Sequence, residues 1–301
     1  MHYLIEFQNI CESDVIILCN VPKLIIIGNI AYDIVDFSKV NKTRESIINK
    51  GGACLFSSIP ASIFQRVGMV AKIGNDFDYS KLFDYDIDLT GVKRIDKPTT
   101  KFYTVWNTID GQSRNVYGEV KPEMEVGATD IPHDFLKANH FHITTANPIK
   151  QLEIIKFLRN NTTATISVDT IDDYAFQNTC KQVFDLVDIA FIDKEYKNLI
   201  DCEAKVKIIK NGKEGCTYLS KNAQFSIFAN VVTDVVDKTG AGDCLNGVFL
   251  SLLTNGVNEK EALKIAVDIA TESIKKQGIM NLEIKKIKRK YQNLAFSLEN
   301  D

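Results

Sequence analysis

The chain has 301 residues, of which 45% are hydrophobic and 25% are charged, with a formal net charge of −3. This composition is typical of a globular protein, and the slight acidity provides no basic surface for nucleic acid or for an anionic membrane. The seven cysteines include no CxxC pair, which argues against a disulfide framework or a zinc site. We therefore expect a cytoplasmic protein whose partner is a small molecule.

The N-terminal third contains the first candidate ligand residue. Residues 1–22 are predicted to be an extension, and residues 23–301 a single α/β domain. The apolar run Leu24–Ile27 predicts a buried strand that ends at Gly28, and Asp33 follows five residues later. Ligands of open α/β sheets gather at this edge of the sheet. A capping or turn role for Asp33 is an equal alternative.

Two further features precede residue 120. The paired glycines Gly51 and Gly52 open a helical segment and let a ligand approach the backbone closely. Residues 99–117 are rich in aromatic and β-branched side chains and are broken at Asp110 and Gly111, which predicts a β-hairpin. We expect this hairpin to be a lid, and it is also a candidate surface for a homodimer.

From His140 onward the strand and helix patterns alternate regularly. Strands are predicted at residues 141–144, 164–168, 189–192 and 206–209. Repeated βα units imply a mostly parallel sheet with helices on both faces, which makes three layers. The polar loop KNGKEG follows the last of these strands, and two antiparallel edge strands are expected after it.

The motif TGAGD is the most informative stretch. It lies between residues 231–236, a predicted strand, and a helical pattern. Gly240 and Gly242 allow backbone amides at the start of that helix to converge on an anion. Asp243 lies in the first helical turn, where a carboxylate is stabilised, so we expect it to be ionised at neutral pH beside a bound phosphate. This arrangement indicates phosphoryl transfer, although such turns are as often purely structural.

Two other phosphate-binding motifs are excluded. A dinucleotide fingerprint requires a third glycine where this chain has Leu245, and a P-loop requires GKS or GKT, which the motif lacks.

The sequence VDKTGAGD, the pair Gly51 and Gly52, and the loop GKEG together resemble the ribokinase-like, or PfkB, carbohydrate kinases. The resemblance extends over residues 23–278 and preserves the order of the motifs. It implies a ribokinase-like three-layer fold with a small β lid at residues 99–117. It also implies an enzyme that transfers the γ-phosphoryl group of ATP to a hydroxyl of a sugar or polyol, with Mg²⁺ and a monovalent cation such as K⁺.

The resemblance also implies roles for single residues. Asp243 would be the catalytic base that takes a proton from the acceptor hydroxyl. The amides of the glycine turn would form the anion hole, namely those of Gly240, Ala241 and Gly242. The acceptor site would be lined by Asp33, Gly51 and Gly52.

The nucleotide and the cations would lie nearby. Lys210, Gly212 and Gly215 would border the nucleotide. Asp237 and Thr239 occupy positions at which family members bind a monovalent cation.

Three positions depart from the family pattern. Phe56 stands where an asparagine usually contacts the sugar. The NxxE motif, which helps to organise Mg²⁺, reads DKEY here, with Asp193 first, Tyr196 last and Glu195 one residue before it. A third acidic position after the strand near Phe141 is replaced in the sequence TTANP.

These departures widen the choice of function. The glycine-pair segment is similar to the inositol-kinase branch of the family. Alternatives are a nucleoside or vitamin kinase, and a regulatory relative that binds its ligand with little or no turnover. Phosphorylation of a panel of sugars, polyols and nucleosides would separate the kinases from the regulatory relative.

Overall fold

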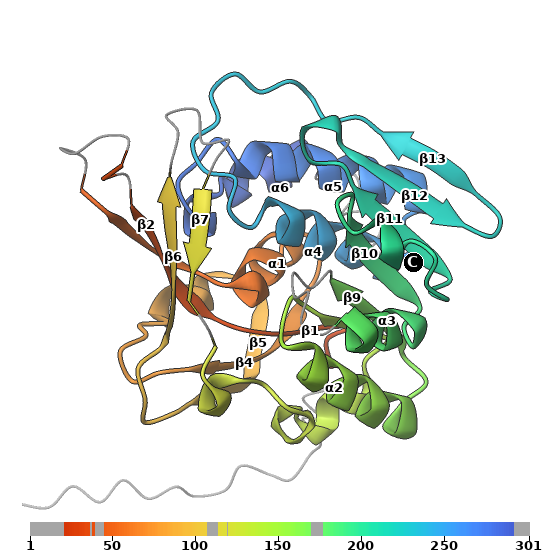
Figure 1. The fold of residues 1–301 in the computed structure, drawn as a ribbon, viewed down its shortest axis with the longest axis horizontal. Coiled ribbons are helices and arrows are strands. Elements are labelled where there is room, and N and C mark those ends of the chain that lie inside the picture. The colour runs from red at the N-terminus through yellow and green to blue at the C-terminus, as the bar shows by residue number, and fades with distance from the viewer. Residues whose placement is uncertain are drawn as a thin grey trace, which may run out of the picture.

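The structure is a computed structural model that describes residues 21–36, 38–39, 45–106, 114–118, 120–169 and 177–291. The predicted N-terminal extension, residues 1–22, lies almost wholly outside these ranges. Two sheets make up the described fold, one of nine strands and one of four (Figure 1).

The nine-stranded sheet has the order β13-β12-β11-β10-β9-β8-β1-β4-β5. From β11 to β5 its strands are parallel, whereas β12 and β13 are antiparallel, which confirms the predicted mostly parallel sheet with an antiparallel edge. Its strands are β1 (Leu24–Ile27), β4 (Val67–Ile73), β5 (Ile87–Arg94), β8 (His140–Ile143), β9 (Thr165–Asp169), β10 (Ile189–Asp193), β11 (Val206–Lys210), β12 (Cys216–Ser220) and β13 (Gln224–Ile227).

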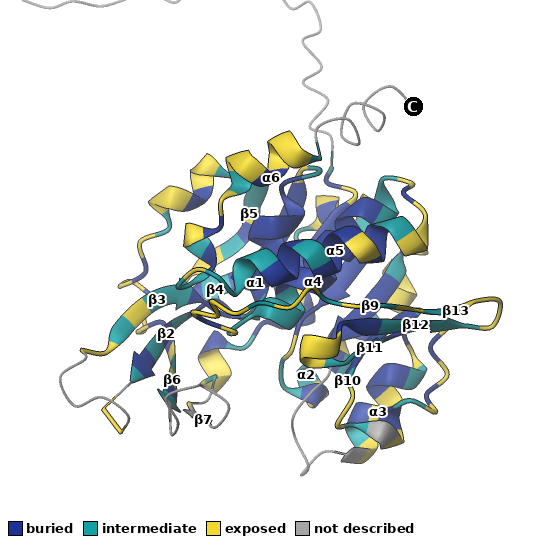
Figure 2. Ribbon diagram, turned by 90° about the horizontal axis from the view of Figure 1, so that it is seen from above, coloured by how far each residue is buried: buried dark blue, intermediate teal, exposed yellow. Residues whose placement is uncertain are grey.

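Helices cover both faces of this sheet and bury two separate cores. In β1, alternate side chains point to opposite faces, so that Leu24 and Ile26 enter one core and Ile25 and Ile27 the other, all fully buried. The first core is covered by α1 (Ala53–Ala61), α4 (Ala241–Thr254), α5 (Glu259–Ser273) and α6 (Ile284–Lys290), and the second by α2 (Pro148–Asn161) and α3 (Gln177–Asp185). Figure 2 shows the inner faces of α4 and α5 buried and much of α6 exposed.

Short 3₁₀ turns connect several elements. They are η1 (Ser80–Asp84), η2 (Pro122–Met124), η3 (Ala128–Asp130), η4 (His133–Lys137), η6 (Lys197–Leu199), η7 (Gly212–Glu214) and η8 (Ile279–Asn281).

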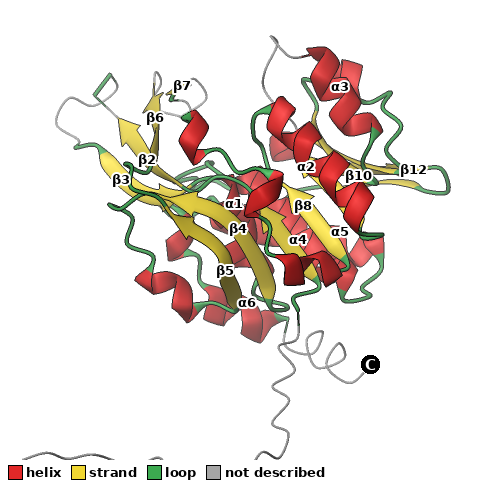
Figure 3. Cartoon of the chain, turned by 90° about the horizontal axis from the view of Figure 1, so that it is seen from below, coloured by secondary structure: helices red, strands yellow, loops and turns green. Residues whose placement is uncertain are grey.

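The four-stranded sheet is larger than the predicted hairpin. Its order is β3-β2-β6-β7, with β2 (Ala31–Asp36), β3 (Ile47–Gly51), β6 (Thr100–Trp106) and β7 (Arg114–Tyr117). The hairpin corresponds to β6 and β7, which pair antiparallel, while residues 107–113 at its tip lie outside the described residues. Figure 3 shows this sheet on the side of β4 and β5, apart from α3 and β12. The residues predicted to bind the acceptor therefore lie in or beside this four-stranded sheet.

One predicted strand is wrong. Residues 231–236 form an extended loop between β13 and α4 instead of a strand, and Val231 is 93% exposed. The loop is joined to the end of α5 by bonds from the Val236 and Asp237 amides to the Ile274 carbonyl, not by a strand ladder. β-branched residues favour a strand only where a neighbouring strand can pair with them. In the described part of the chain, no helix is long and apolar enough to cross a membrane.

Candidate active site

Charged residues converge where three parallel strands end. Asp169, Asp193 and Lys210 are the last residues of β9, β10 and β11, which are neighbours in the large sheet. The Lys210 Nζ lies 2.6 Å from Asp169 Oδ1 and 3.5 Å from Asp193 Oδ1. Asn246 Nδ2 donates to the other carboxyl oxygen of Asp169 at 2.9 Å. The Lys210 and Asp169 side chains are only 11% and 3% exposed, so this ion pair is shielded from water.

Asp243 enters the same group of charges from the first turn of α4. Its Oδ1 atom is buried and has no hydrogen-bond partner among the described residues. Burial and the nearby Asp169 carboxylate raise the pKa of Asp243 well above its usual range, and the Lys210 ammonium only partly opposes them. This shift is opposite in direction to the one that a helix N-terminus alone would cause. A helix N-terminus contributes about 0.3–1 kcal/mol, whereas removing a charge from water costs several kcal/mol.

Lys210 is the cation of this group. Burial disfavours its charged form, but Asp169 and Asp193 outweigh burial and raise the pKa of Lys210. A Cβ added at Gly242 would lie 3.3 Å from the Lys210 Nζ, so the ammonium lies directly behind the glycine turn. Lys210 therefore contributes a fixed positive charge close to the predicted anion hole.

The glycine turn fits tightly on α1. Gly240 is the N-cap of α4 with φ of 73°, a left-handed conformation that favours glycine. A Cβ on Gly240 would lie 2.1 Å from the Phe56 ring, and Phe56 is only 4% exposed. The phenylalanine that departs from the family pattern therefore packs beneath the turn. The Ala241 amide donates to the Lys238 carbonyl at 3.3 Å, so this predicted anion-hole amide has a competing acceptor within the chain.

The structure also brings the three predicted acceptor residues together. Asp33, in β2, is buried, and its Oδ2 accepts a hydrogen bond from the Gly52 amide at 3.4 Å. A Cβ on Gly51 would lie 1.8 Å from that oxygen. Gly52 has φ of 90°, and its Cβ would lie 2.5 Å from the Asn29 carbonyl oxygen. Both glycines are thus required for the close contact of β3 and α1 with the β1–β2 connection.

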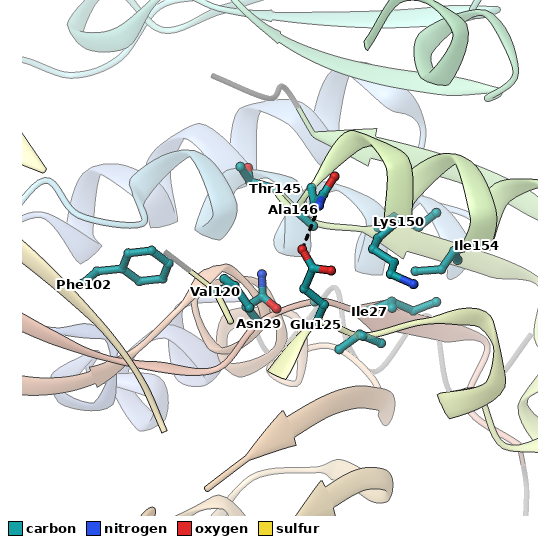
Figure 4. Close-up of a pocket in the computed structure, with 13 residues that line it drawn as sticks. Ile27, Asn29, Phe102, Val120, Glu125, Thr145, Ala146, Lys150 and Ile154 are labelled. Carbon is teal, nitrogen blue, oxygen red and sulfur yellow. Dashed lines mark hydrogen bonds between the residues drawn. The ribbon is translucent and has the colours of Figure 1, made fainter. Parts of the chain in front are cut away.

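A cavity of about 400 Å³ adjoins these residues (Figure 4). It lies between β6 of the small sheet, the ends of β1 and β8, and the start of α2. Its lining is mixed, and the apolar side chains include Ile27, Phe102, Val120, Ile143 and Ile154. Its polar side chains come from Asn29, Glu125, Thr145, Asn147 and Lys150.

The three residues predicted to border the nucleotide lie in two different places. Gly212 is the first residue of η7, the turn between β11 and β12, and Gly215 directly follows this turn; both have positive φ. Nothing lies within 4 Å of a Cβ added at Gly212, so its surface is open. The Lys210 ammonium is held in the carboxylate group described above. The nucleotide-binding role of these three residues stays a prediction.

The predicted cation residues lie before the glycine turn. Asp237 is buried, and its two carboxyl oxygens accept hydrogen bonds from the Thr239 amide at 3.0 Å and from Gln277 Nε2 at 2.9 Å. Within the described residues, no group of three or more His, Cys, Asp or Glu side chains is arranged to hold a metal ion by itself. A divalent cation here needs further ligands, as Mg²⁺ commonly takes from substrate phosphates.

The sequence reasoning missed Asp169, Asn246 and Glu125. A signal existed for two of them, because Asp169 ends its strand as Asp193 does and Asn246 lies one helical turn after Asp243. Glu125 comes from the loop after η2, where no motif marked it.

Comparison with known proteins gives a consistent result. The model of the pfkB family of carbohydrate kinases matches residues 23–286. A cytidine kinase from Thermococcus kodakarensis is 24% identical over 283 residues, covering 87% of this chain and 99% of that protein. An E. coli protein described as ribokinase II and solved with ATP and Mg²⁺ has a TM-score of 0.73 at 20% identity, covering 90% of this chain and 99% of its own. A Burkholderia thailandensis nucleoside kinase solved with inosine has a TM-score of 0.74 at 15% identity, covering 90% and 97%. The two solved structures share the fold of this chain.

Proposed function

Because this chain belongs to the pfkB family of carbohydrate kinases, we propose that it transfers the γ-phosphoryl group of ATP to a hydroxyl on the sugar or polyol part of a small molecule. Its fold is ribokinase-like, and it is a phosphotransferase with an alcohol group as acceptor. The observation that supports the proposal best is the Asp243 carboxyl, which is buried beside the glycine turn and whose Oδ1 has no hydrogen-bond partner in the described part of the chain.

In the proposed reaction Asp243 is the base. Its Oδ1 accepts the proton of the acceptor hydroxyl while that oxygen bonds to the γ-phosphorus. The bond from the γ-phosphorus to the oxygen that bridges it to the β-phosphate breaks, and ADP leaves with that oxygen. The amides of the turn from Gly240 to Gly242, with the Lys210 ammonium behind them, face the charge that spreads over the phosphoryl oxygens.

We propose that Mg²⁺ binds near the end of β10. Burial and the carboxylates of Asp169 and Glu195 raise the pKa of Asp193 despite the opposing Lys210 charge, which indicates excess negative charge at the end of β10. The Asp193 side chain is 43% exposed and so accessible to a cation. Bound Mg²⁺ neutralises the charge of the nucleotide phosphates. We assign Asp193 and Glu195 to its surroundings, and Asp237 with Thr239 to a monovalent cation.

ATP is proposed to lie along the open turn at Gly212. The loop that follows β13 lies beside this turn and carries two strongly exposed apolar side chains, Phe228 at 81% and Val231 at 93%. Exposed apolar groups of this kind commonly mark a surface that a ligand covers. A purine base is a ligand that fits, because its faces are apolar.

The test is a phosphorylation assay on purified protein with Mg-ATP and a panel of sugars, polyols including inositol, and nucleosides, with products identified by mass spectrometry. At least one acceptor should gain a phosphoryl group, and the D243N variant serves as the blank. A panel with no product, in the presence of measurable ATP binding, would instead support the regulatory relative. A homodimer through β6 and β7 stays a prediction, which light scattering of the same sample tests.

A further inference from the structure

We propose that the cavity beside Asn29 is a nucleobase subsite, and that Glu125 selects bases that carry an exocyclic amino group. The acceptor is then a nucleoside such as cytidine or adenosine, and the transferred phosphoryl group goes to its ribose. This inference rests on the proposed kinase function and specifies its substrate class.

The cavity faces the same side of the small sheet as the acceptor residues. Asp33 in β2 and Phe102 in β6 are directly paired in the register of the sheet. Side chains of directly paired residues project from the same face. Phe102 lines the cavity, and the Asn29 backbone beside the cavity contacts Gly52, whose amide donates to Asp33. A sugar held at Asp33 therefore extends its substituent towards Phe102.

The shape and lining of the cavity suit a planar ring. About 400 Å³ lies within the range of small-molecule sites. The Phe102 ring and the aliphatic side chains of Val120 and Ile143 enclose it from different elements. Aromatic rings stack favourably on the flat faces of nucleobases, and this contact is independent of the base. The apolar part of the wall therefore favours a nucleoside, which presents a flat ring to it, over a free sugar or a cyclitol, which present hydroxyls on every side.

Glu125 supplies the polar selection. Its carboxyl accepts a hydrogen bond from Asn147 Nδ2 at 2.8 Å, and its backbone carbonyl accepts one from Lys72 Nζ at 2.6 Å. Asn147 thus holds the carboxyl of Glu125, and Lys72 holds its backbone. Figure 4 shows the Glu125 side chain between Asn29 and Lys150. An ionised carboxylate only accepts hydrogen bonds. It attracts an amino group and repels the keto oxygen that uracil or hypoxanthine presents in the same place.

Lys150, in the first turn of α2, contributes a cation to the same cavity as Glu125. Its ammonium pairs with Glu153 at 2.8 Å, and an ammonium has three donors, so two remain for a ligand. Cytosine and adenine both present an unprotonated ring nitrogen next to the amino group. The combination of one acceptor and one donor in the cavity therefore matches their hydrogen-bonding edge, whereas uracil and hypoxanthine present the reverse pattern.

The experiment compares kcat/KM for cytidine and uridine, for adenosine and inosine, and for ribose and myo-inositol. In the wild type we expect the amino-bearing member of each nucleoside pair to be preferred by about 10- to 100-fold, because an unmatched charged hydrogen bond is costly. Glu125→Gln keeps the size but adds a donor, so the preference should fall to within about threefold. Glu123→Gln, at an exposed position in η2 two residues earlier, should keep the full preference. Thermal melting verifies that both variants fold.

Several results would overturn the subsite while leaving the kinase intact. They are equal use of cytidine and uridine by the wild type, an unchanged preference in Glu125→Gln, and better turnover of ribose or inositol than of any nucleoside. If no compound is phosphorylated, the proposed function fails, and calorimetry of cytidine and uridine on the wild type then tests the subsite alone. Tighter binding of cytidine supports it, and equal or absent binding overturns it.

Discussion

The two halves of the site are built in opposite ways. At the ends of β9, β10 and β11, the charged side chains pair with one another, and Lys210 joins Asp169 and Asp193. In the cavity beside β6, apolar side chains share the lining with polar groups that come from connecting segments and from the start of α2. The first half is fixed by strand ends in a sheet that is buried on both faces, and the second by segments that are free to vary.

The residues proposed for phosphoryl transfer and those proposed to select the substrate therefore lie on different kinds of structure. Strand ends are positioned by the register of the whole sheet, so the charges that we propose to act on the phosphoryl group are held in fixed places. Loops tolerate substitution, so the acceptor is selected where the fold allows change. The charged half also carries one cation against three carboxylates, those of Asp169, Asp193 and Asp243, and burial together with this excess of negative charge raises the pKa of Asp243. The following variants test the contrast, in order of expected effect.

Asp243→Asn should have the largest effect. Removing a general base lowers turnover by about 10²–10⁴-fold, while calorimetry should show nearly unchanged ATP binding. Asp201→Asn, at an exposed position outside the site, is the matched control and should keep full activity. Turnover of Asp243→Asn within threefold of the wild type would exclude Asp243 as the base.

Lys210→Met should destabilise the fold. Breaking a buried pair costs about 3–5 kcal/mol because the remaining charge has no partner, and denaturant unfolding measures this loss. Adding Asp169→Asn to the same chain should restore part of it. Additive losses in the double variant would show that the two side chains are not coupled.

The pH dependence follows from the raised pKa of Asp243. A base must be ionised, so kcat/KM should fall on acidification through a pKa well above 3.8, the ordinary value of an aspartate. Stability has the opposite sign. The folded state favours the protonated carboxyl, so this contribution is present at low pH and is lost as the pH rises through the folded pKa. The melting temperature of Asp243→Asn relative to the wild type should therefore rise with pH, and a constant difference would contradict the raised pKa.

Gly212→Ala should have the smallest effect and tests the nucleotide turn. Gly212 and Gly256 both have positive φ with open space around an added Cβ, so alanine at either should cost about 1–2 kcal/mol of backbone strain. Only Gly212→Ala should also raise KM for ATP, because only this glycine lies in the proposed nucleotide surface. An equal KM in the two variants would remove Gly212 from that surface.

The sequence was sufficient for the parts that depend on local motifs. The meeting of Asp33 with Gly51 and Gly52 was expected only from the family resemblance, whereas the parallel sheet and the hairpin pairing were expected from strand patterns. These features follow from rules that act over a few residues or at the ends of strands.

Features that depend on packing between distant segments were not predicted. The strand at residues 231–236 failed because no partner strand was available. The inward direction of Lys210 depends on Asp169, 41 residues away along the chain. Glu125 reaches the cavity through contacts with Lys72 and Asn147. In each case the deciding contact is made by a residue with no motif of its own.

The close contact of α1 with α4 limits the substitutions that these two helices can accept. A Cβ on Gly247 would lie 2.0 Å from the Ser57 carbonyl oxygen, and Ser251 Oγ donates to the Ala61 carbonyl at 2.8 Å, so the two helices touch backbone to backbone. Gly52 precedes α1 and Gly240 precedes α4, so the predicted acceptor amide and the predicted anion hole are both attached to this packed pair of helices. We expect substitutions in the small sheet to be tolerated more readily than a change in the facing surface of α1 or of α4 alone.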